Sequence, residues 1–143
     1  MEIQFKYTSI KTDQFAELDI PSVTSINEYS LSGEVQTGYN YSARSIMITV
    51  SANYKVHDKL AMTIKVSSFF EIEEDSWNSL KDGEYVVIPK DFLLHIGGIA
   101  FSTTRGVLFA KTEGTDLNRI ILPIIYMDQV IKGDMKIAIP EGE

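Results

Sequence analysis

The chain has 143 residues, 44% of them hydrophobic and 23% charged, which is typical of one folded domain and argues against a disordered chain. A formal net charge of −7 disfavours contact with phosphate backbones, so nucleic acids are not expected partners. The absence of cysteine excludes disulfides, thiolate catalysis and sulfur-ligated metals, and it is compatible with a cytoplasmic location.

Apolar and polar residues alternate in the first half of the chain, which predicts half-buried strands. A first strand begins at Ile3, and Pro21 should end it or place it at a sheet edge, before a looser stretch over residues 21–28. The clearest alternation covers residues 46–56, and a similar pattern precedes it from Tyr29 to Thr37.

Turn signals separate these strands. Gly38-Tyr39-Asn40 precedes the central strand, and His57-Asp58-Lys59 follows it. Alternation resumes from Leu60 to Ile72, so residues 46–72 should form an antiparallel hairpin.

The second half of the chain predicts helices, which makes the fold class α+β. One helical turn is expected over residues 73–80, followed by an extended segment that ends at Pro89. Pro89 suits the first turn of a helix that reaches about residue 110, and a short final helix is expected over 127–131. The buried stripe of the long helix should comprise Phe92, Ile96, Ile99, Thr103 and Val107.

Glycines lie inside the expected long helix, where each costs about 1 kcal/mol relative to alanine. Gly98, Ser102 and Gly106 are spaced by four residues and therefore form a stripe of small side chains along one face. Such a stripe either packs on the protein's own sheet or lets the helix of a second subunit approach closely. The second alternative predicts an oligomer interface at these residues.

Catalytic and metal-binding motifs are missing from the sequence. It contains no phosphate-binding glycine motif, no nucleophile elbow and no HExxH pattern, so an enzyme or small-molecule-binding protein that uses His57 or His95 has little support. The acidic run lacks the ligand spacing of an EF-hand, which favours a solvated loop over a calcium site; it consists of Glu71, Glu73, Glu74 and Asp75. Neither a signal peptide nor a membrane-inserted segment is expected.

Several apolar side chains have no obvious core position. Phe69 and Phe70 are adjacent, so on a strand they point to opposite faces of the sheet. Trp77, the only tryptophan, lies in the acidic loop and either folds back onto the core or marks an exposed groove. Met47 and Met62 in the paired strands suit adaptable apolar contacts. A partly apolar sheet face requires cover from an oligomer or a ligand.

The order of these elements resembles the SecB family of protein-export chaperones over roughly residues 3–132. The matching pieces begin with the strand FKYTSI (5–10), a β meander, and the strand VSSFFEI (66–72). A crossover loop and a helix begun by Pro89 and FLL (92–94) follow, with TRG (104–106) toward its end and LPIIYMD (122–128) opening a second helix.

This resemblance implies a single domain with a four-stranded antiparallel sheet, two helices on one side, and assembly into a dimer or a tetramer. It implies an ATP-independent holdase without a cofactor that binds unfolded polypeptides such as preproteins in an apolar groove. The family passes such clients to the motor ATPase of the protein translocase. By resemblance, the groove would be lined by Phe69, Phe70, Ile72, Trp77, Tyr85, Phe92 and Leu93.

Two features depart from the family. Thr63 and Lys65 stand where the motor-binding surface has an apolar residue and an acid, so the inverted charge argues against the translocase motor as a partner. The tail over residues 136–143 is shorter than the family's. Two alternatives therefore stay open: a SecB-like chaperone dedicated to an antitoxin, and an assembly protein whose apolar surface is buried in its own oligomer.

Overall fold

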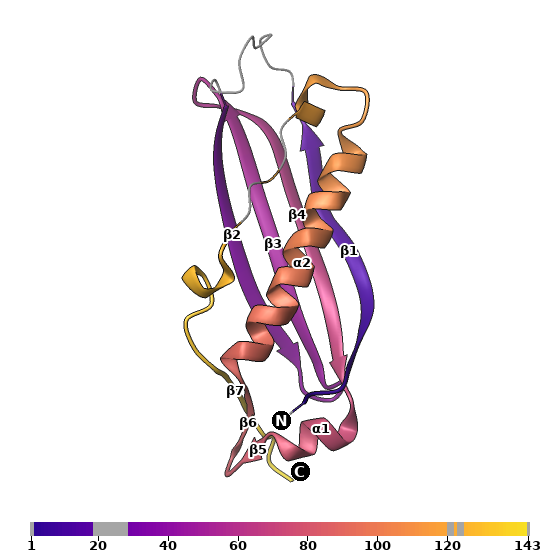
Figure 1. Ribbon diagram of the computed structural model, residues 1–143, viewed down its shortest axis with the longest axis vertical. Helices are drawn as coiled ribbons and strands as arrows, with labels where there is room; N and C mark the ends of the chain where they lie inside the picture. Colours follow the sequence, from indigo (N-terminus) through magenta and orange to yellow (C-terminus); the bar gives the residue numbers. More distant parts are fainter. Residues whose placement is uncertain (1, 19–28, 120–121, 123–124, 143) are drawn as a thin grey trace.

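The alternating residues build the main layer of the protein, a four-stranded antiparallel sheet. The computed structural model describes residues 2–18, 29–119, 122 and 125–142. The strands lie in the order β1-β4-β3-β2, so β1 and β2 are the two edges (Figure 1). Their bounds are β1 (Phe5–Glu17), β2 (Tyr29–Asn40), β3 (Ser45–Val56) and β4 (Lys59–Ile72).

The β3–β4 hairpin confirms the predicted one. His57 and Asp58 have φ of 49° and 66°, as in the two-residue turns that match the twist of antiparallel strands. The preceding turn comes later than predicted, because β2 continues through Gly38 to Asn40. The Asn40 side chain accepts a hydrogen bond from the Ala43 N–H at 3.1 Å, so asparagine rather than glycine organises this turn.

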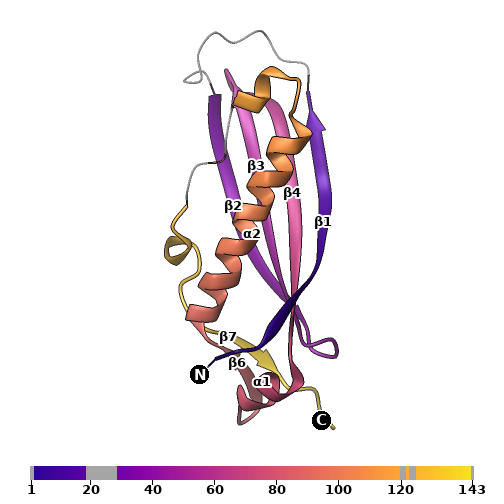
Figure 2. The same ribbon diagram turned by 45° about the vertical axis from the view of Figure 1, so that its right-hand side comes forward.

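One face of the sheet forms the core. Every second residue of β3 from Ile46 to Val56 is buried, and so is the matching set of β4 from Met62 to Ile72. Full burial of one such large apolar side chain stabilises the fold by about 1.5–3 kcal/mol. The long helix α2 (Lys90–Lys111) lies obliquely across this face (Figures 1 and 2).

The opposite face of the sheet is mostly polar. Ser67 joins a chain of side-chain hydrogen bonds, at 2.8 Å from Thr49 Oγ1 and 2.5 Å from Asp13 Oδ2. Phe69 is half-buried on this face and Phe70 is buried on the other, as their adjacency predicted. The edges differ in regularity, since β1 has two bulges against β4 whereas the β2–β3 register is unbroken.

The long helix begins after Pro89, as predicted, and the Lys90 N–H donates to the Asp134 carboxylate at 2.7 Å. Its buried stripe is rotated from the predicted one and consists of Phe92, Leu93, Ile96, Gly97, Ala100, Phe101, Thr104 and Leu108. Ile99, Thr103 and Val107 are only half-buried, because apolar residues occur all around this helix and spacing alone does not choose the inner face. By length and composition α2 is apolar enough to cross a membrane, but 44% of its apolar 18-residue stretch is buried inside the protein.

The sequence did not predict a second, three-stranded sheet. The expected helical turn is α1 (Glu74–Ser79), and after it β5 (Lys81–Asp82) pairs with β6 (Tyr85–Ile88), which pairs with β7 (Met135–Ala138). The 3-10 turns are η2 (Asp116–Arg119) and η3 (Met127–Gln129), and η3 takes the place of the expected short final helix. The predicted strand end at Pro21 and the stretch 21–28 lie outside the described residues.

Candidate polypeptide-binding site

Most of the groove residues implied by the family resemblance are core residues in this structure. Phe70, Ile72, Trp77, Phe92 and Leu93 are each 8% exposed or less, so they present little surface to a client in this conformation. Only Phe69 and Tyr85 present surface, and they belong to different sheets. Contact between these seven residues and a client stays a prediction.

Aromatic packing holds this part of the core closed. The Phe5 ring lies 5.2 Å from Phe92, edge-on, and 6.1 Å from Phe70. The Trp77 ring lies edge-on to Tyr41 at 5.6 Å, so Trp77 folds back onto the core instead of marking an exposed groove. Such ring pairs contribute about 0.5–1.5 kcal/mol each beyond their burial.

The stripe of Gly98, Ser102 and Gly106 lies on the outer side of α2. A Cβ built at Gly98 or Gly106 meets no atom within 4 Å, and Ser102 is exposed. The alternative in which the stripe packs on the protein's own sheet is therefore wrong. Gly97 is the glycine that a close approach requires, because its Cβ would lie 3.1 Å from Ile131 Cδ1 and 3.2 Å from Met127 Sδ.

An apolar hollow opens between β2, β3 and α2. We call it the β2 hollow; it holds about 180 Å³ and is lined mainly by Leu31, Val35, Val50, Phe101, Leu122 and Ile125. Arg105 helps to fix its outer wall, because its Nε donates to the Leu122 carbonyl at 3.0 Å. Leu31 is 40% exposed at the rim, and β2 has no strand on its outer side within the described residues.

Sequence reasoning did not single out the β2 hollow. Its only signal was the alternation in residues 29–37, which places Leu31 and Val35 on one face of a strand. That pattern does not reveal that the strand is an edge, nor that Leu122 and Ile125 lie beside it.

A second hollow lies between the start of the chain and the start of α2. It holds about 510 Å³, with Ile3, Phe5, Pro89 and Phe92 as apolar lining and Glu2, Asp91 and His95 as polar lining. The His95 ring is 6.0 Å from the Phe5 ring and edge-on to it.

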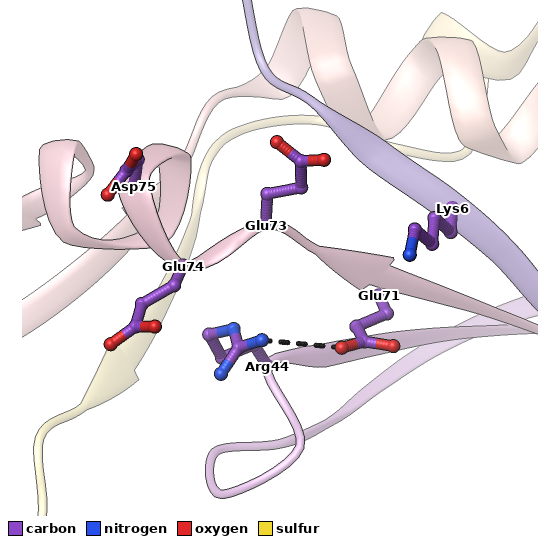
Figure 3. Close-up of a pocket in the computed structure, with 6 residues that line it drawn as sticks. All are labelled: Lys6, Arg44, Glu71, Glu73, Glu74 and Asp75. Carbon is purple, nitrogen blue, oxygen red and sulfur yellow. Dashed lines mark hydrogen bonds and ion pairs between the residues drawn. The ribbon is translucent and has the colours of Figure 1, made fainter.

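Charged side chains line a third hollow, of about 290 Å³, near α1. Arg44 Nη2 lies 3.3 Å from Glu71 Oε1, and Arg44 Nε also donates to the Ile72 carbonyl at 3.0 Å. Figure 3 shows that the carboxylates of the acidic run point in different directions rather than toward one centre. Among the residues whose placement is described, no group of three or more His, Asp or Glu side chains gathers to hold a metal.

Among the described residues, the buried phenol of Tyr54 on β3 is the titratable group with a strongly shifted pKa. Burial raises the pKa of Tyr54 to about 12, because desolvation penalises the phenolate. Its hydroxyl has no hydrogen-bond partner in the described part of the chain. Tyr54 therefore stays neutral in ordinary conditions and acts as a core residue rather than a catalytic group.

Neither a protein-family model nor a curated protein sequence matches the chain. A solved structure does: the Mycobacterium tuberculosis Rv1957 SecB-like chaperone in complex with a ChAD peptide from the Rv1956 HigA1 antitoxin. The two chains are 12% identical, and the match covers 85% of this chain and 90% of that one with a TM-score of 0.51. The four-stranded sheet with its long and short helices thus has the α+β fold of a SecB-like chaperone.

Proposed function

We propose that this protein is an ATP-independent chaperone of the holdase type that binds extended segments of unfolded polypeptide at the β2 edge. The observation that carries the proposal is the β2 hollow, an apolar site beside an edge strand whose outer side carries no partner strand among the described residues. We also propose a cytoplasmic location, because polypeptides are synthesised in the cytoplasm and are still unfolded there.

The geometry of this edge suits an extended client. A client strand added to β2 gains main-chain hydrogen bonds of low sequence specificity, and its inward side chains enter the hollow. A cavity of roughly 150 Å³ is large enough for an aromatic ring such as benzene, so the β2 hollow accommodates one large apolar side chain. Burial of that side chain contributes about 1.5–3 kcal/mol.

The structural comparison supports a chaperone over an enzyme, because the matching protein is a chaperone with a bound peptide. That peptide comes from an antitoxin, which supports an antitoxin as the client alongside the broader class of preproteins. Lys65 lies on the polar sheet face, half-buried beside Thr63, so a positive charge stands where the resemblance requires an acid for docking on the translocase motor.

A matched pair of variants tests this function. Leu31→Asp puts a charge at the rim of the β2 hollow, whereas Ser32→Asp puts the same charge on the other face of the same strand. The wild type and Ser32→Asp should suppress aggregation of an unfolded test protein without ATP, and Leu31→Asp should suppress it several-fold less. Equal suppression by both variants would place the client elsewhere, and no suppression by the wild type at several-fold excess would exclude the holdase function.

The glycine stripe on the outer side of α2, where Ser102 and Gly106 are exposed and Gly98 is half-buried, supports a second role in self-assembly. Gly98, Ser102 and Gly106 present a smooth outer face on α2, and such faces allow close contact between helices. We propose that a second copy packs there, in a dimer or a tetramer. Gly98→Leu and Gly106→Leu should then lower the mass in solution while keeping the far-ultraviolet spectrum, and an unchanged mass would exclude this interface.

A further inference from the structure

We propose that the edge of β6 is a second docking site for extended polypeptide, occupied in this structure by the protein's own C-terminal strand β7. A client segment that alternates apolar and basic residues replaces β7 at this edge. The inference rests on the proposed function, to which it adds a place and a class of ligand.

The C-terminal strand is attached by few interactions. Among the described residues β7 pairs with β6 alone, Ile137 is the one residue of β7 that is fully buried, and Met135 and Ile139 are partly buried against the core. Beyond the ladder, the Ile139 N–H donates to the Glu84 carbonyl at 2.9 Å, and the Asp134 carboxylate accepts the Lys90 N–H. A short terminal strand with so little burial opens locally, without unfolding of the main sheet.

The side chains of β7 show which kinds of residue fit against the edge of β6. Met135 and Ile137 point inward, opposite Ile88 and Val86, and occupy the apolar positions. Lys136 points outward, and its Nζ lies 5.8 Å from the centre of the Tyr85 ring. A ligand strand therefore places apolar side chains at alternate positions and a cation between them.

Charge near this edge favours the same class of ligand. A hollow of about 440 Å³ continues from the β6–β7 pair, and Glu84 is the charged lining residue that remains when β7 leaves, because Glu141 belongs to the segment that follows β7. The Glu84 carboxylate, which directly precedes β6, attracts a basic residue on the docked strand or next to it. Tyr85, one of the client-binding residues implied by the family resemblance, lies within the proposed site.

A reversible covalent lock tests whether β7 must leave. The chain has no cysteine, so Val87→Cys combined with Lys136→Cys introduces a single possible disulfide. These residues face each other, and the Ile139–Glu84 hydrogen bond sets the alternation of the ladder so that they form a non-hydrogen-bonded pair. Their Cα atoms are then about 4.5 Å apart, which is within the range for a disulfide.

The probe is a labelled peptide with the sequence of residues 134–140, DMKIAIP, and binding is followed by fluorescence anisotropy. The oxidised double variant should bind it at least ten-fold more weakly than the reduced form, because the lock removes the open state that binding requires. Replacing the peptide's lysine by glutamate should also weaken binding to the reduced form.

Two further variants avoid dependence on the disulfide. Ile137→Ser loosens β7 and should increase peptide affinity, whereas Ala138→Ser changes the exposed face of the same strand and should not. Equal binding by oxidised and reduced protein overturns the inference, while aggregation suppression by the same samples shows whether the chaperone function stands. A disulfide-linked dimer overturns it as well, because β7 would then be exchanged between copies. If no form binds peptide or suppresses aggregation, both proposals fail.

Discussion

Replacing Tyr54 by phenylalanine should stabilise this protein. The Tyr54 side chain is fully buried, and its hydroxyl has no partner in the described part of the chain, so folding removes that hydroxyl from water without compensation. Burial of an unpaired hydroxyl costs about 1–3 kcal/mol. The small cavity left by the missing oxygen atom is destabilising and reduces this gain by a few tenths of a kcal/mol, at roughly 24 cal/mol per Å³. The net gain for Tyr54→Phe is therefore about 1–2 kcal/mol.

Urea unfolding at a fixed protein concentration measures this gain. With a slope of about 2 kcal/mol per M, the midpoint should rise by roughly 0.5–1 M while the slope stays the same. Far-ultraviolet circular dichroism and the fluorescence of Trp77, the only tryptophan, follow the transition. Tyr7→Phe is the matched control, because the Tyr7 hydroxyl lies 2.7 Å from Ser68 Oγ and 2.9 Å from Thr103 Oγ1. Tyr7→Phe should lose about 1 kcal/mol. If Tyr54→Phe is also destabilised by 1 kcal/mol or more, the Tyr54 hydroxyl is paired and the reasoning is wrong.

Three further changes have expected outcomes. The raised Tyr54 pKa, about 12, means that the folded state keeps a proton that the unfolded state loses above pH 10, so raising the pH from 10 to 12 should lower the free energy of unfolding of the wild type by about 2 kcal/mol more than that of Tyr54→Phe, as measured by urea titrations at each pH. Gly106→Ala should raise the free energy of unfolding by about 1 kcal/mol, and Gly97→Ala should raise it less because Ile131 and Met127 crowd its Cβ; equal gains in thermal melts would contradict this difference. Ser67→Ala should lower the free energy of unfolding by about 1–2 kcal/mol in urea titrations, since the buried Thr49 hydroxyl loses its partner, and an unchanged midpoint would mean that water replaces it.

The strands were predictable because period-2 alternation is a local property. Residues 46–72 alternate clearly, and the β3–β4 hairpin follows from that pattern and from the turn at His57 and Asp58. The small sheet was not predictable, because β7 is four residues long and pairs with a strand distant in sequence. Its alternation is too short to distinguish a strand from a tail.

The candidate site was predictable only in outline. Periodicity places Phe70 on one face of a strand, but it does not say whether α2 or solvent covers that face. Burial of Phe92 and Trp77 depends on contacts with Phe5 and Tyr41, which no local pattern contains. The exposure of the glycine stripe was likewise undetermined, because α2 is apolar on several sides and its rotation is fixed by the sheet beneath it.

The difference between the two edges of the main sheet limits how far strand addition can propagate. β2 offers an edge with an unbroken register, whereas the shifts between Tyr7 and Ser9 and between Thr12 and Gln14 bend the edge of β1. Lys6 and Lys11 also place charges along β1, and charged, bulged edges discourage further pairing. Pairing of β2 in one copy with β1 in the next is therefore disfavoured, so the protein can expose a receptive edge at β2 without templating a fibril of its own chains by that route.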